Sequence, residues 1–248
     1  GARVAHNRFH HAPSSAMRIE GNDHLIEYNA VDHVVRESDD QGGIDMWGNP
    51  SYRGVTIRYN RWQDIGGGEM PCGQAGIRFD DAICGAVVYG NLFERTSEGH
   101  FGGVQIHGGQ NNIVDNNIFT ECRYGVSFSP WGQERWEEFL KREPIRKRMF
   151  TDVNIRVPPY SKRYPELADL WGKADINRIW RNLFVGAEEP LYKKPKGTDE
   201  WENQLFAEMP DIEAVAARSP FRPLPPLDEI GLYDDPVRTR AMANGAQP

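Results

Sequence analysis

An apolar residue followed by Asn three positions later, and by a bulky apolar residue five positions later, recurs along this chain. The six copies are Val4-Asn7-Phe9, Ile26-Asn29-Val31, Ile57-Asn60-Trp62, Val88-Asn91-Phe93, Val114-Asn117-Phe119 and Ile179-Asn182-Phe184. The shortest interval between successive Asn residues is 22 residues. A sub-pattern that returns at intervals of this size is typical of a solenoid. We interpret the shortest interval as one coil of a parallel β-helix and the longer ones as coils with inserted loops.

A second pattern precedes the Asn motif: a small residue and then alternating apolar and polar residues. It occurs at Ala16–Glu20, Gly43–Trp47, Gly76–Asp80, Gly103–His107 and Gly125–Ser129. Alternation of this kind predicts half-buried strands in which every second side chain faces the core. The inward pairs would be Met17/Ile19, Ile44/Met46, Ile77/Phe79, Val104/Ile106 and Val126/Phe128. The residues between them are then expected to point to solvent.

Stacked coils explain why the Asn residues recur. Coils lie about 4.8 Å apart, so equivalent residues stand directly above one another. Each Asn side chain can then bond turn backbone groups and the Asn of the next coil. Without such partners, a buried amide would cost a few kcal/mol. One repeat cannot bury its own apolar face, so the pattern must extend over several coils. The predicted fold class is all-β, a parallel β-helix.

The pattern divides the chain into a solenoid and two departures from it. Coils are predicted over residues 1–190, and because Gly1 falls partway into a repeat, we expect earlier coils before it. An insertion at 131–173 contains two short predicted helices, Glu134–Leu140 and Pro165–Leu170. Residues 191–248 are Pro-rich and read as an irregular segment with one helix near Asp211–Ala217. We expect this segment to pack along the solenoid or cap its end.

Composition restricts the possible partners. The net charge is −7, which argues against a sequence-independent nucleic-acid binder, since that function requires a basic face. No apolar stretch of 18 residues is present, so no membrane span is predicted. The three cysteines show no metal-binding spacing, and we expect Cys84 and Cys122 to be buried in the stack.

The outward positions of the strands form two predicted columns of polar residues. One column is Arg18, Asp45, Arg78, Gln105 and Ser127, and the other is Glu20, Trp47, Asp80, His107 and Ser129. Each residue alone is adequately explained as part of a solvated strand face. Together they bring acids, an Arg, a His and a Trp onto consecutive coils, which favours a functional site. Trp47, with Tyr52 and Trp131 on flanking loops, offers flat apolar faces that could stack on sugar rings.

Two acidic pairs carry the candidate chemistry. Asp39-Asp40 precedes the second strand and Asp80-Asp81 ends the third. Two carboxyl groups about 5–10 Å apart, one protonated and one ionised, are what glycoside cleavage requires. The alternative is that Asp39 and Asp40 shape the turn before Gly42-Gly43.

His107 is either an acid/base group or a hydrogen-bond partner of Asp80 one coil below. No spacing resembles a zinc site. Calcium bound by Asp45, Asp80 and Asp81 is possible, because hard oxygen ligands suit it.

Several short segments resemble glycoside hydrolase family 141, right-handed parallel β-helix proteins of the pectin-lyase-like superfamily. They include Glu37–Gly43, Arg53–Asn60, Asp64–Gly66, Phe79–Asp81, Val88–Asn91, Asn116–Phe119, Arg163–Leu167 and Glu229–Tyr233. The resemblance implies a secreted or periplasmic carbohydrate-active enzyme with α-L-fucosidase or xylanase activity. It also implies that Asp40 and Asp81 are the catalytic carboxylates. The chain departs from the family at Asp45 and at Trp47–Pro50, two places that face the expected cleft.

Three functions follow as hypotheses. The first is a glycoside hydrolase in which Asp40 and Asp81 are the acid/base pair and Asp80, Asp45 and His107 support them. Arg78 would then hold an oxyanion or hydroxyl of the carbohydrate substrate, together with Gln105 and the aromatic residues. The second is a calcium-dependent polysaccharide lyase in which Arg78 or His107 abstracts a proton. The third is a non-catalytic carbohydrate-binding β-helix. The oligomeric state is not predicted.

Overall fold

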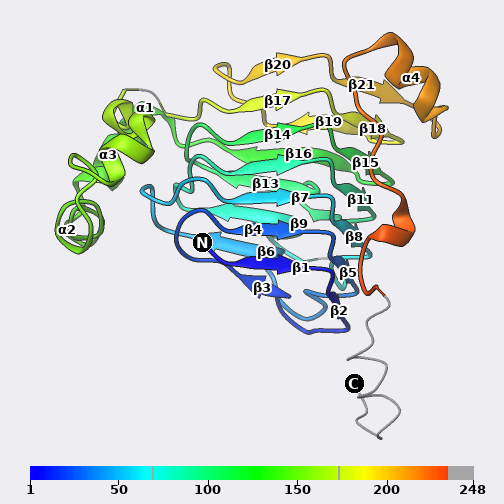
Figure 1. The fold of residues 1–248 in the computed structure, drawn as a ribbon, viewed down its shortest axis with the longest axis horizontal. Helices are drawn as coiled ribbons and strands as arrows, with labels where there is room; N and C mark the ends of the chain where they lie inside the picture. Colours follow the sequence, from blue (N-terminus) through cyan, green and yellow to red (C-terminus); the bar gives the residue numbers. More distant parts are fainter. Residues whose placement is uncertain (69, 173, 234–248) are drawn as a thin grey trace, which may run out of the picture.

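The protein winds into a stack of coils lined by three sheets of parallel strands (Figure 1). The structure, a computed structural model, describes residues 1–68, 70–172 and 174–233. In spatial order, the first sheet contains β1 (Arg3–Ala5), β4 (Leu25–Glu27), β7 (Thr56–Arg58), β10 (Val87–Tyr89), β14 (Ile113–Asp115), β17 (Arg178–Trp180) and β20 (Asp199–Trp201). The second contains β2 (Arg8–His10), β5 (Ala30–Asp32), β8 (Arg61–Gln63), β11 (Leu92–Glu94), β15 (Ile118–Thr120), β18 (Leu183–Val185) and β21 (Gln204–Phe206).

The third sheet carries the predicted polar columns. Its strands are β3 (Met17–Arg18), β6 (Gln41–Trp47), β9 (Gly73–Asp80), β13 (Val104–His107), β16 (Tyr124–Ser129) and β19 (Glu189–Tyr192). A short strand, β12 (Ser97–Gly99), pairs antiparallel with β9. The parallel β-helix predicted from the repeat is therefore confirmed.

The strand register matches the repeats read from the sequence. The apolar residue that opens each Asn motif pairs with its equivalent in the next coil, as in Ile57 with Val88. The bulky residue two positions after Asn forms a second stack, in which Phe93 lies 4.7 Å from Phe119 between ring centroids. The predicted inward residues of the third sheet are buried over the same coils, except Ile19 of the first inward pair, which is half-buried. A coil thus contributes one such residue from each of the first two sheets and a pair from the third to a shared core.

A ladder of Asn side chains runs along the corner between the first and second sheets. Its members are Asn7, Asn29, Asn60, Asn91, Asn117, Asn182 and Asn203. In each step, the backbone N–H and the side-chain amide of one Asn both donate to the Oδ1 of the next, at 2.9 to 3.0 Å. The residue before each Asn has a φ between 49° and 62°. This left-handed conformation turns the chain from one sheet to the next, and the amide hydrogen bonds stabilise the corner.

The repeat extends further than the sequence pattern predicted. Residues 191–206 were expected to leave the solenoid, but β19, β20 and β21 pair with the three sheets and complete another coil. Asn203 is its ladder residue. The motif was missed because Glu200 occupies the position where earlier coils carry Val or Ile. An apolar residue is not required there, because Glu200 is exposed on the last coil.

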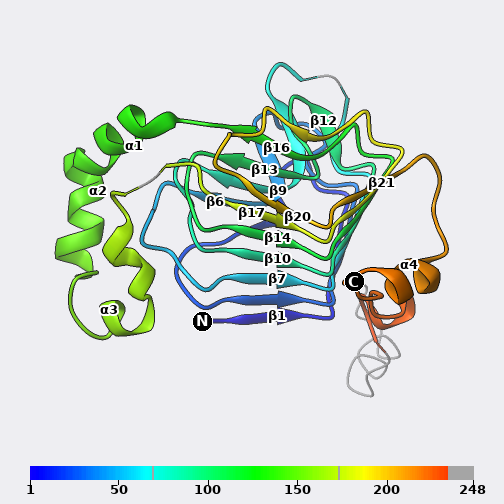
Figure 2. The same cartoon turned by 90° about the horizontal axis from the view of Figure 1, so that it is seen from above.

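The insertion after β16 folds into helices beside the stack (Figure 2). They are α1 (Gly132–Lys141), α2 (Glu143–Lys147), the π-helical turn η1 (Arg148–Asp152), α3 (Tyr160–Arg163) and the 3₁₀-helix η2 (Pro165–Asp169). The two predicted helices correspond to α1 and η2, and the other three were missed. Trp136, Leu140, Met149 and Leu170 form a small core of their own that also buries Ala82 and Cys84 of the solenoid. The insertion is therefore packed against the coils. Among the described residues, no helix has the length and apolar character needed to cross a bilayer.

The C-terminal segment follows the outer surface of the corner that holds the Asn ladder. It contains α4 (Ile212–Arg218), close to the predicted helix, and the 3₁₀-helix η3 (Leu227–Glu229). Phe221 is fully buried against β11, β15 and β18. Arg222 exchanges backbone hydrogen bonds with the Asn116 side chain, and the Gly231 N–H donates to the Tyr28 carbonyl. From α4 to residue 233 the segment lies along the solenoid; residues 234–248 lie outside the described part.

The Asn ladder should contribute strongly to stability. Asn91 is fully buried, and its side chain donates to Ile57, Tyr89 and Asn117 while accepting from Asn60. We predict that Asn91→Ala lowers the free energy of unfolding by about 3 kcal/mol or more, because it leaves several buried groups without partners. Urea denaturation would measure this.

The matched control is Asn7→Ala, at the half-buried first rung, whose side chain donates to Ala5 and Asn29. It is expected to cost about 1 kcal/mol. Equal losses at both positions would contradict a ladder whose strength comes from burial.

Candidate functional site

The third sheet aligns the candidate residues across successive coils. Asp45 lies beside Arg78 and Trp47 beside Asp80 in the register of β6 and β9. Further along, Arg78 pairs with Gln105 on β13. The two polar columns predicted from the sequence are therefore adjacent rows on one face of the solenoid.

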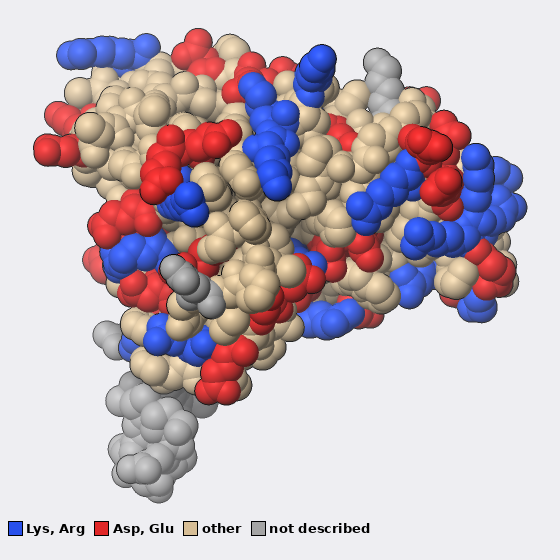
Figure 3. All heavy atoms as spheres, turned by 180° about the vertical axis from the view of Figure 1, so that it is seen from behind, with Lys and Arg blue, Asp and Glu red and all other residues tan. Residues whose placement is uncertain are grey.

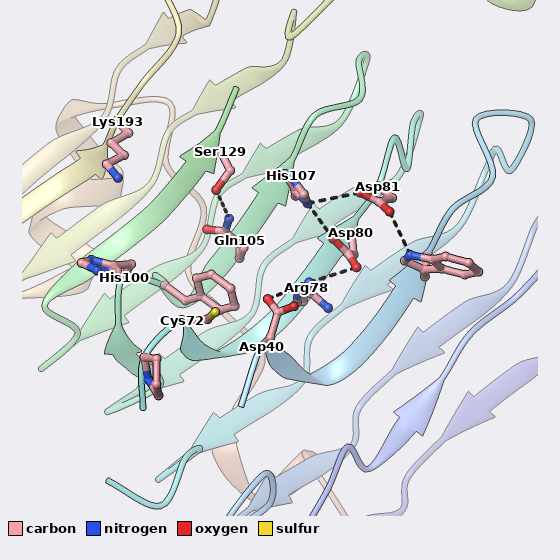
Figure 4. Close-up of a pocket in the computed structure, with 13 residues that line it drawn as sticks. Asp40, Cys72, Arg78, Asp80, Asp81, His100, Gln105, His107, Ser129 and Lys193 are labelled. Atoms are coloured by element: carbon pink, nitrogen blue, oxygen red, sulfur yellow. Dashed lines mark hydrogen bonds and ion pairs between the residues drawn. The ribbon is translucent and has the colours of Figure 1, made fainter. Parts of the chain in front are cut away.

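A pocket of about 530 Å³ opens over these rows (Figure 4). It is lined by Asp40, Trp47, Pro71, Cys72, Arg78, Asp80, Asp81, His100, Phe101, Gln105, His107, Ser129 and Lys193. Asp40 enters from the residue immediately before β6, and Asp81 follows the end of β9. Both have left-handed backbone angles, with φ of 57° and 41°. The loop before Gly42 thus does carry Asp40 to the same cleft as Asp80 and Asp81.

Arg78 is the positive centre of this pocket. Its guanidinium contacts Asp40 Oδ1 at 2.8 Å, Asp80 Oδ2 at 2.9 Å and Asp45 Oδ1 at 3.4 Å. The side chain is 8% exposed, and Phe101 lies under it with 5.8 Å between the guanidinium carbon and the ring centroid. Buried carboxylates are tolerated when they are paired and hydrogen-bonded, so Arg78 is what allows Asp45 and Asp80 to be buried beside the more exposed Asp40.

His107 is held between acids on one side and a cation on the other. Its Nδ1 lies 2.7 Å from Asp80 and 3.4 Å from Asp81. The Arg135 guanidinium lies 3.3 Å from Nε2. Because Arg can only donate, Nε2 must accept, and the Nδ1–H is then the group that donates to Asp80. The predicted contact between His107 and Asp80 one coil below is confirmed.

The pKa values of two carboxyl groups are raised in this pocket. Burial raises the pKa of Asp45 to about 6, helped by the nearby Asp80 charge and opposed by Arg78. Burial also raises the pKa of Asp40, again with repulsion from Asp80 and with opposition from Arg78. Asp40 remains largely accessible, since 53% of its side chain is exposed. A carboxyl group that is both accessible and disposed to hold a proton is suited to general-acid chemistry.

Asp39 has a different role from its neighbour. Burial alone would raise its pKa, but hydrogen bonds donated by the backbone N–H groups of Gly73 and Cys72 lower it below the usual value. Asp39 therefore binds the backbone at the start of β9 in the next coil, whereas Asp40 faces the pocket.

The expectation that the outward residues of the third sheet are exposed is wrong for the middle coils. The strand residues between the inward pairs were expected to point to solvent, but Asp45, Arg78, Gln105 and Ser127 are buried. They point away from the core and are covered by loops and by one another; for example, Ser127 Oγ donates to Gln105 Oε1.

The three aromatic residues proposed to stack on sugars also separate in the structure. Trp131 is 8% exposed and is covered by Arg135, whose guanidinium carbon lies 4.2 Å from the ring centroid. It packs edge-on against His107, so the prediction of an open sugar-stacking face at Trp131 is wrong. Tyr52 lies outside this pocket and lines a neighbouring one. Trp47 is 44% exposed, and its Nε1–H donates to Asp81 at 3.1 Å.

Sequence reasoning missed the wall of the pocket formed by Cys72, His100, Phe101 and Lys193. His100 and Phe101 come from the loop after β12, and Lys193 follows β19. The antiparallel pairing of β12 with β9 places that loop against Arg78, where Phe101 contacts the guanidinium. These residues sit in segments without the repeat, so no periodic signal could have located them.

The predicted calcium ligands do not form a shared site. Asp45 and Asp80 are bridged by Arg78, which places positive charge where a cation would have to lie. Ligand atoms of Asp80, Asp81 and His107 do fall within 4.8 Å of one another. His107 and Trp47 already donate hydrogen bonds to these carboxylates. The donor set therefore fits a hydrogen-bonded network better than a calcium site made of Asp45, Asp80 and Asp81.

A family model described as a right handed beta helix region matches residues 1–135. The chain belongs to this family. The match agrees with the three stacked parallel sheets and the Asn ladder of the structure. Comparison with curated proteins and with solved structures found no match. The right-handed β-helix family fixes the architecture, while the reaction has to be argued from the pocket.

Arg78 should hold this β-helix together at neutral pH. We predict that Arg78→Met destabilises the protein by roughly 3 kcal/mol or more at pH 7, because three carboxylates lose their shared partner. Removing the cation raises their pKa values in the folded state, so the folded protein binds protons more readily and the penalty shrinks towards pH 4. Denaturation at both pH values would measure it.

Arg123→Met is the control, because the Arg123–Glu188 ion pair is exposed. It is expected to leave stability nearly unchanged at both pH values. A penalty at Arg78 that is the same at pH 4 and pH 7 would contradict the electrostatic explanation.

Asp45 should make the β-helix less stable as the pH rises. Its pKa is about 6 when folded, against an ordinary value of 3.8. Between these values the folded state binds more protons than the unfolded state, so stability falls as pH rises through this window. We predict that Asp45→Asn gains about 1 to 3 kcal/mol relative to the wild type between pH 4 and pH 7.5. A difference between the two proteins that does not change with pH would rule this out.

Proposed function

We propose that this protein is a glycoside hydrolase acting on an oligosaccharide or polysaccharide. The observation that carries the proposal is the meeting of Asp40 and Asp81 in one open pocket, together with the raised pKa of Asp40. Glycoside cleavage needs one carboxyl group that donates a proton and another that attacks or activates water. These two residues are also the ones that the resemblance to glycoside hydrolase family 141 implies.

In this proposal Asp40 is the general acid. Its carboxyl group is accessible, and the influences that raise its pKa favour the protonated form needed to protonate a leaving oxygen. Arg78 positions it through the 2.8 Å contact. As pH rises above the pKa of Asp40, the acid form is lost, so the rate is expected to fall on the alkaline side.

Asp81 is the proposed nucleophile or base. It is held by the Trp47 Nε1–H and by His107, and 30% of its side chain is exposed. Asp80 is 11% exposed and engaged by both Arg78 and His107. Asp80, Asp45 and His107 are therefore positioning residues in this scheme, and they orient Arg78 and Asp81.

The surroundings of the acids fit a carbohydrate ligand. Trp47 presents a half-exposed ring beside Asp81, and aromatic faces of this kind stack on the apolar faces of sugars. Gln105, Ser129, His100 and Lys193 supply hydrogen-bonding groups on the other side of the pocket (Figure 4). The resemblance to family 141 adds fucosidase or xylanase activity and a secreted or periplasmic location to the proposal. On the face drawn in Figure 3, acidic and basic side chains are interspersed.

The two other hypotheses predict different behaviour. A lyase would need Arg78 or His107 to accept a proton, yet Arg78 is paired with three carboxylates, and the acceptor nitrogen of His107, Nε2, is contacted by the Arg135 guanidinium. A non-catalytic binding protein would need no carboxyl group with a raised pKa in the pocket. The pocket thus favours hydrolysis, and product analysis separates the three.

The test is product analysis with xylan, fucosylated glycans and uronate polysaccharides, with and without EDTA. We predict new reducing ends that form in EDTA. Asp40→Asn and Asp81→Asn should each lower the rate by about 100-fold or more, because loss of acid/base catalysis costs on this scale. Asp199→Asn, an exposed carboxylate on the last coil, should keep the wild-type rate.

An unsaturated product that requires calcium would establish the lyase instead. Binding of any of these polysaccharides without turnover would establish the binding protein. Full activity in the Asp40 or Asp81 variant would remove that residue from the mechanism.

A further inference from the structure

A second pocket adjoins the first and is built partly by the helical insertion. Its volume is about 300 Å³, and it is lined by Glu20, Trp47, Asn49, Ser51, Tyr52, Arg148, Asp152, Val153 and Tyr160. Trp47 lines both pockets. The exposed indole of Trp47 therefore lies between the pocket that contains Asp40 and Asp81 and a second cavity that the proposed chemistry does not use.

The solenoid side of this cavity is the loop that follows β6. Asn49 Oδ1 accepts hydrogen bonds from the backbone N–H of Ser51 at 3.0 Å and from its hydroxyl at 2.7 Å. Asn49 and Ser51 are both buried. This internal network fixes the loop, so Tyr52 is presented to the cavity from a defined position.

The other side is the π-helical turn η1, whose first and last residues, Arg148 and Asp152, both line the cavity. Arg148 donates to the Gly48 carbonyl, and its guanidinium carbon lies 5.5 Å from the centroid of the Trp47 ring. π-helical turns are uncommon and occur frequently at functional sites. Arg148 thus connects the insertion to the residue shared by the two pockets.

Several contacts anchor the insertion to the coils. The Tyr160 hydroxyl donates to Asn22 at 3.2 Å, and the Tyr164 hydroxyl donates to Asp23 at 2.8 Å. The buried Arg53 lies 3.5 Å from Glu166. These contacts come from separate parts of the insertion, so they fix both its position and the shape of the second pocket before a ligand binds.

We propose that this second pocket binds an additional sugar unit of the same substrate chain. The inference rests on the proposed hydrolase function and extends it to substrate class: an oligosaccharide or polysaccharide held on both sides of Trp47. Tyr52 and Tyr160 supply aromatic faces, while Arg148 and Asp152 supply hydrogen-bonding groups. A few convergent polar groups among aromatic side chains are typical of small-ligand sites.

The test compares substrates of different length. Oligosaccharides of two to six units, prepared from the xylan, fucosylated glycan or uronate polymer that is cleaved, are compared with the matching aryl monosaccharide glycoside. Tyr52→Ala and Arg148→Met should each raise KM for the hexasaccharide about tenfold with kcat little changed, because uniform binding is lost. Turnover of the aryl glycoside should not change.

Two controls separate binding from folding. Tyr52→Phe keeps the ring and should retain most of the affinity for the hexasaccharide. Arg156→Met removes an exposed guanidinium of the insertion that lies over Phe150, away from this pocket, and should behave as the wild type. Melting temperatures are measured for all variants: Tyr52→Ala should lower Tm somewhat, because Tyr52 packs partly against the core, whereas Tyr52→Phe and Arg156→Met should not.

Equal losses on the aryl glycoside and the hexasaccharide, or no loss on either, would overturn the second subsite while leaving the hydrolase intact. If no substrate is cleaved, the hydrolase proposal fails, and calorimetric titration with the xylan, fucosylated and uronate hexasaccharides decides the subsite separately. Binding that Tyr52→Ala weakens about tenfold would support it. Binding that Tyr52→Ala leaves unchanged, or no binding at all, would overturn it.

Discussion

The hydrogen-bonded stacking of Asn side chains at one corner is the constraint on which the rest of this molecule depends. Each amide satisfies backbone groups of its own turn and of the adjacent coil, so a coil that slipped by one residue would leave buried polar groups unpaired. The ladder therefore fixes the register in all three sheets. Because the register is fixed, Asp45 lies beside Arg78, and Trp47 beside Asp80, across neighbouring coils.

Charge balance around Arg78 is the second condition for the site. Four carboxyl groups gather in a small volume, and three of them contact one nearly buried guanidinium. The planar guanidinium of Arg can donate to several carboxylate oxygens at once. The compact ammonium group of Lys would contact them less well. Burial, with a smaller contribution from repulsion by Asp80, still raises the pKa values of Asp40 and Asp45. Arg78 opposes this shift, so the ability of Asp40 to carry a proton comes from its burial and from the neighbouring acids.

Loops supply the pocket residues that lie outside the repeating strands. Asp40, Phe101 and Lys193 reach the pocket from outside the regular alternation of the strands, and the helical insertion supplies Arg148 next to Trp47. The coils act as a rigid platform whose side chains are spaced by the β-sheet, and the loops set the shape of the cavities above it. This division is common in proteins whose binding sites lie on loops held by a rigid scaffold.

The sequence by itself determined the coil repeat, the inward stacks, the Asn corner and the two rows that contain Asp45, Trp47, Arg78, Asp80 and His107. A periodic pattern in the sequence reflects the surroundings of each side chain, and in a solenoid equivalent side chains have the same surroundings in successive coils. Only the tertiary structure decided that the outward rows are covered, that Trp131 is packed under Arg135, and that Asp39 binds the start of β9 while Asp40 faces the pocket. It also revealed a further coil, where Glu200 breaks the pattern, and the wall formed by His100, Phe101 and Lys193. These features depend on how non-repeating loops fold across the sheet, and no spacing along the chain encodes that.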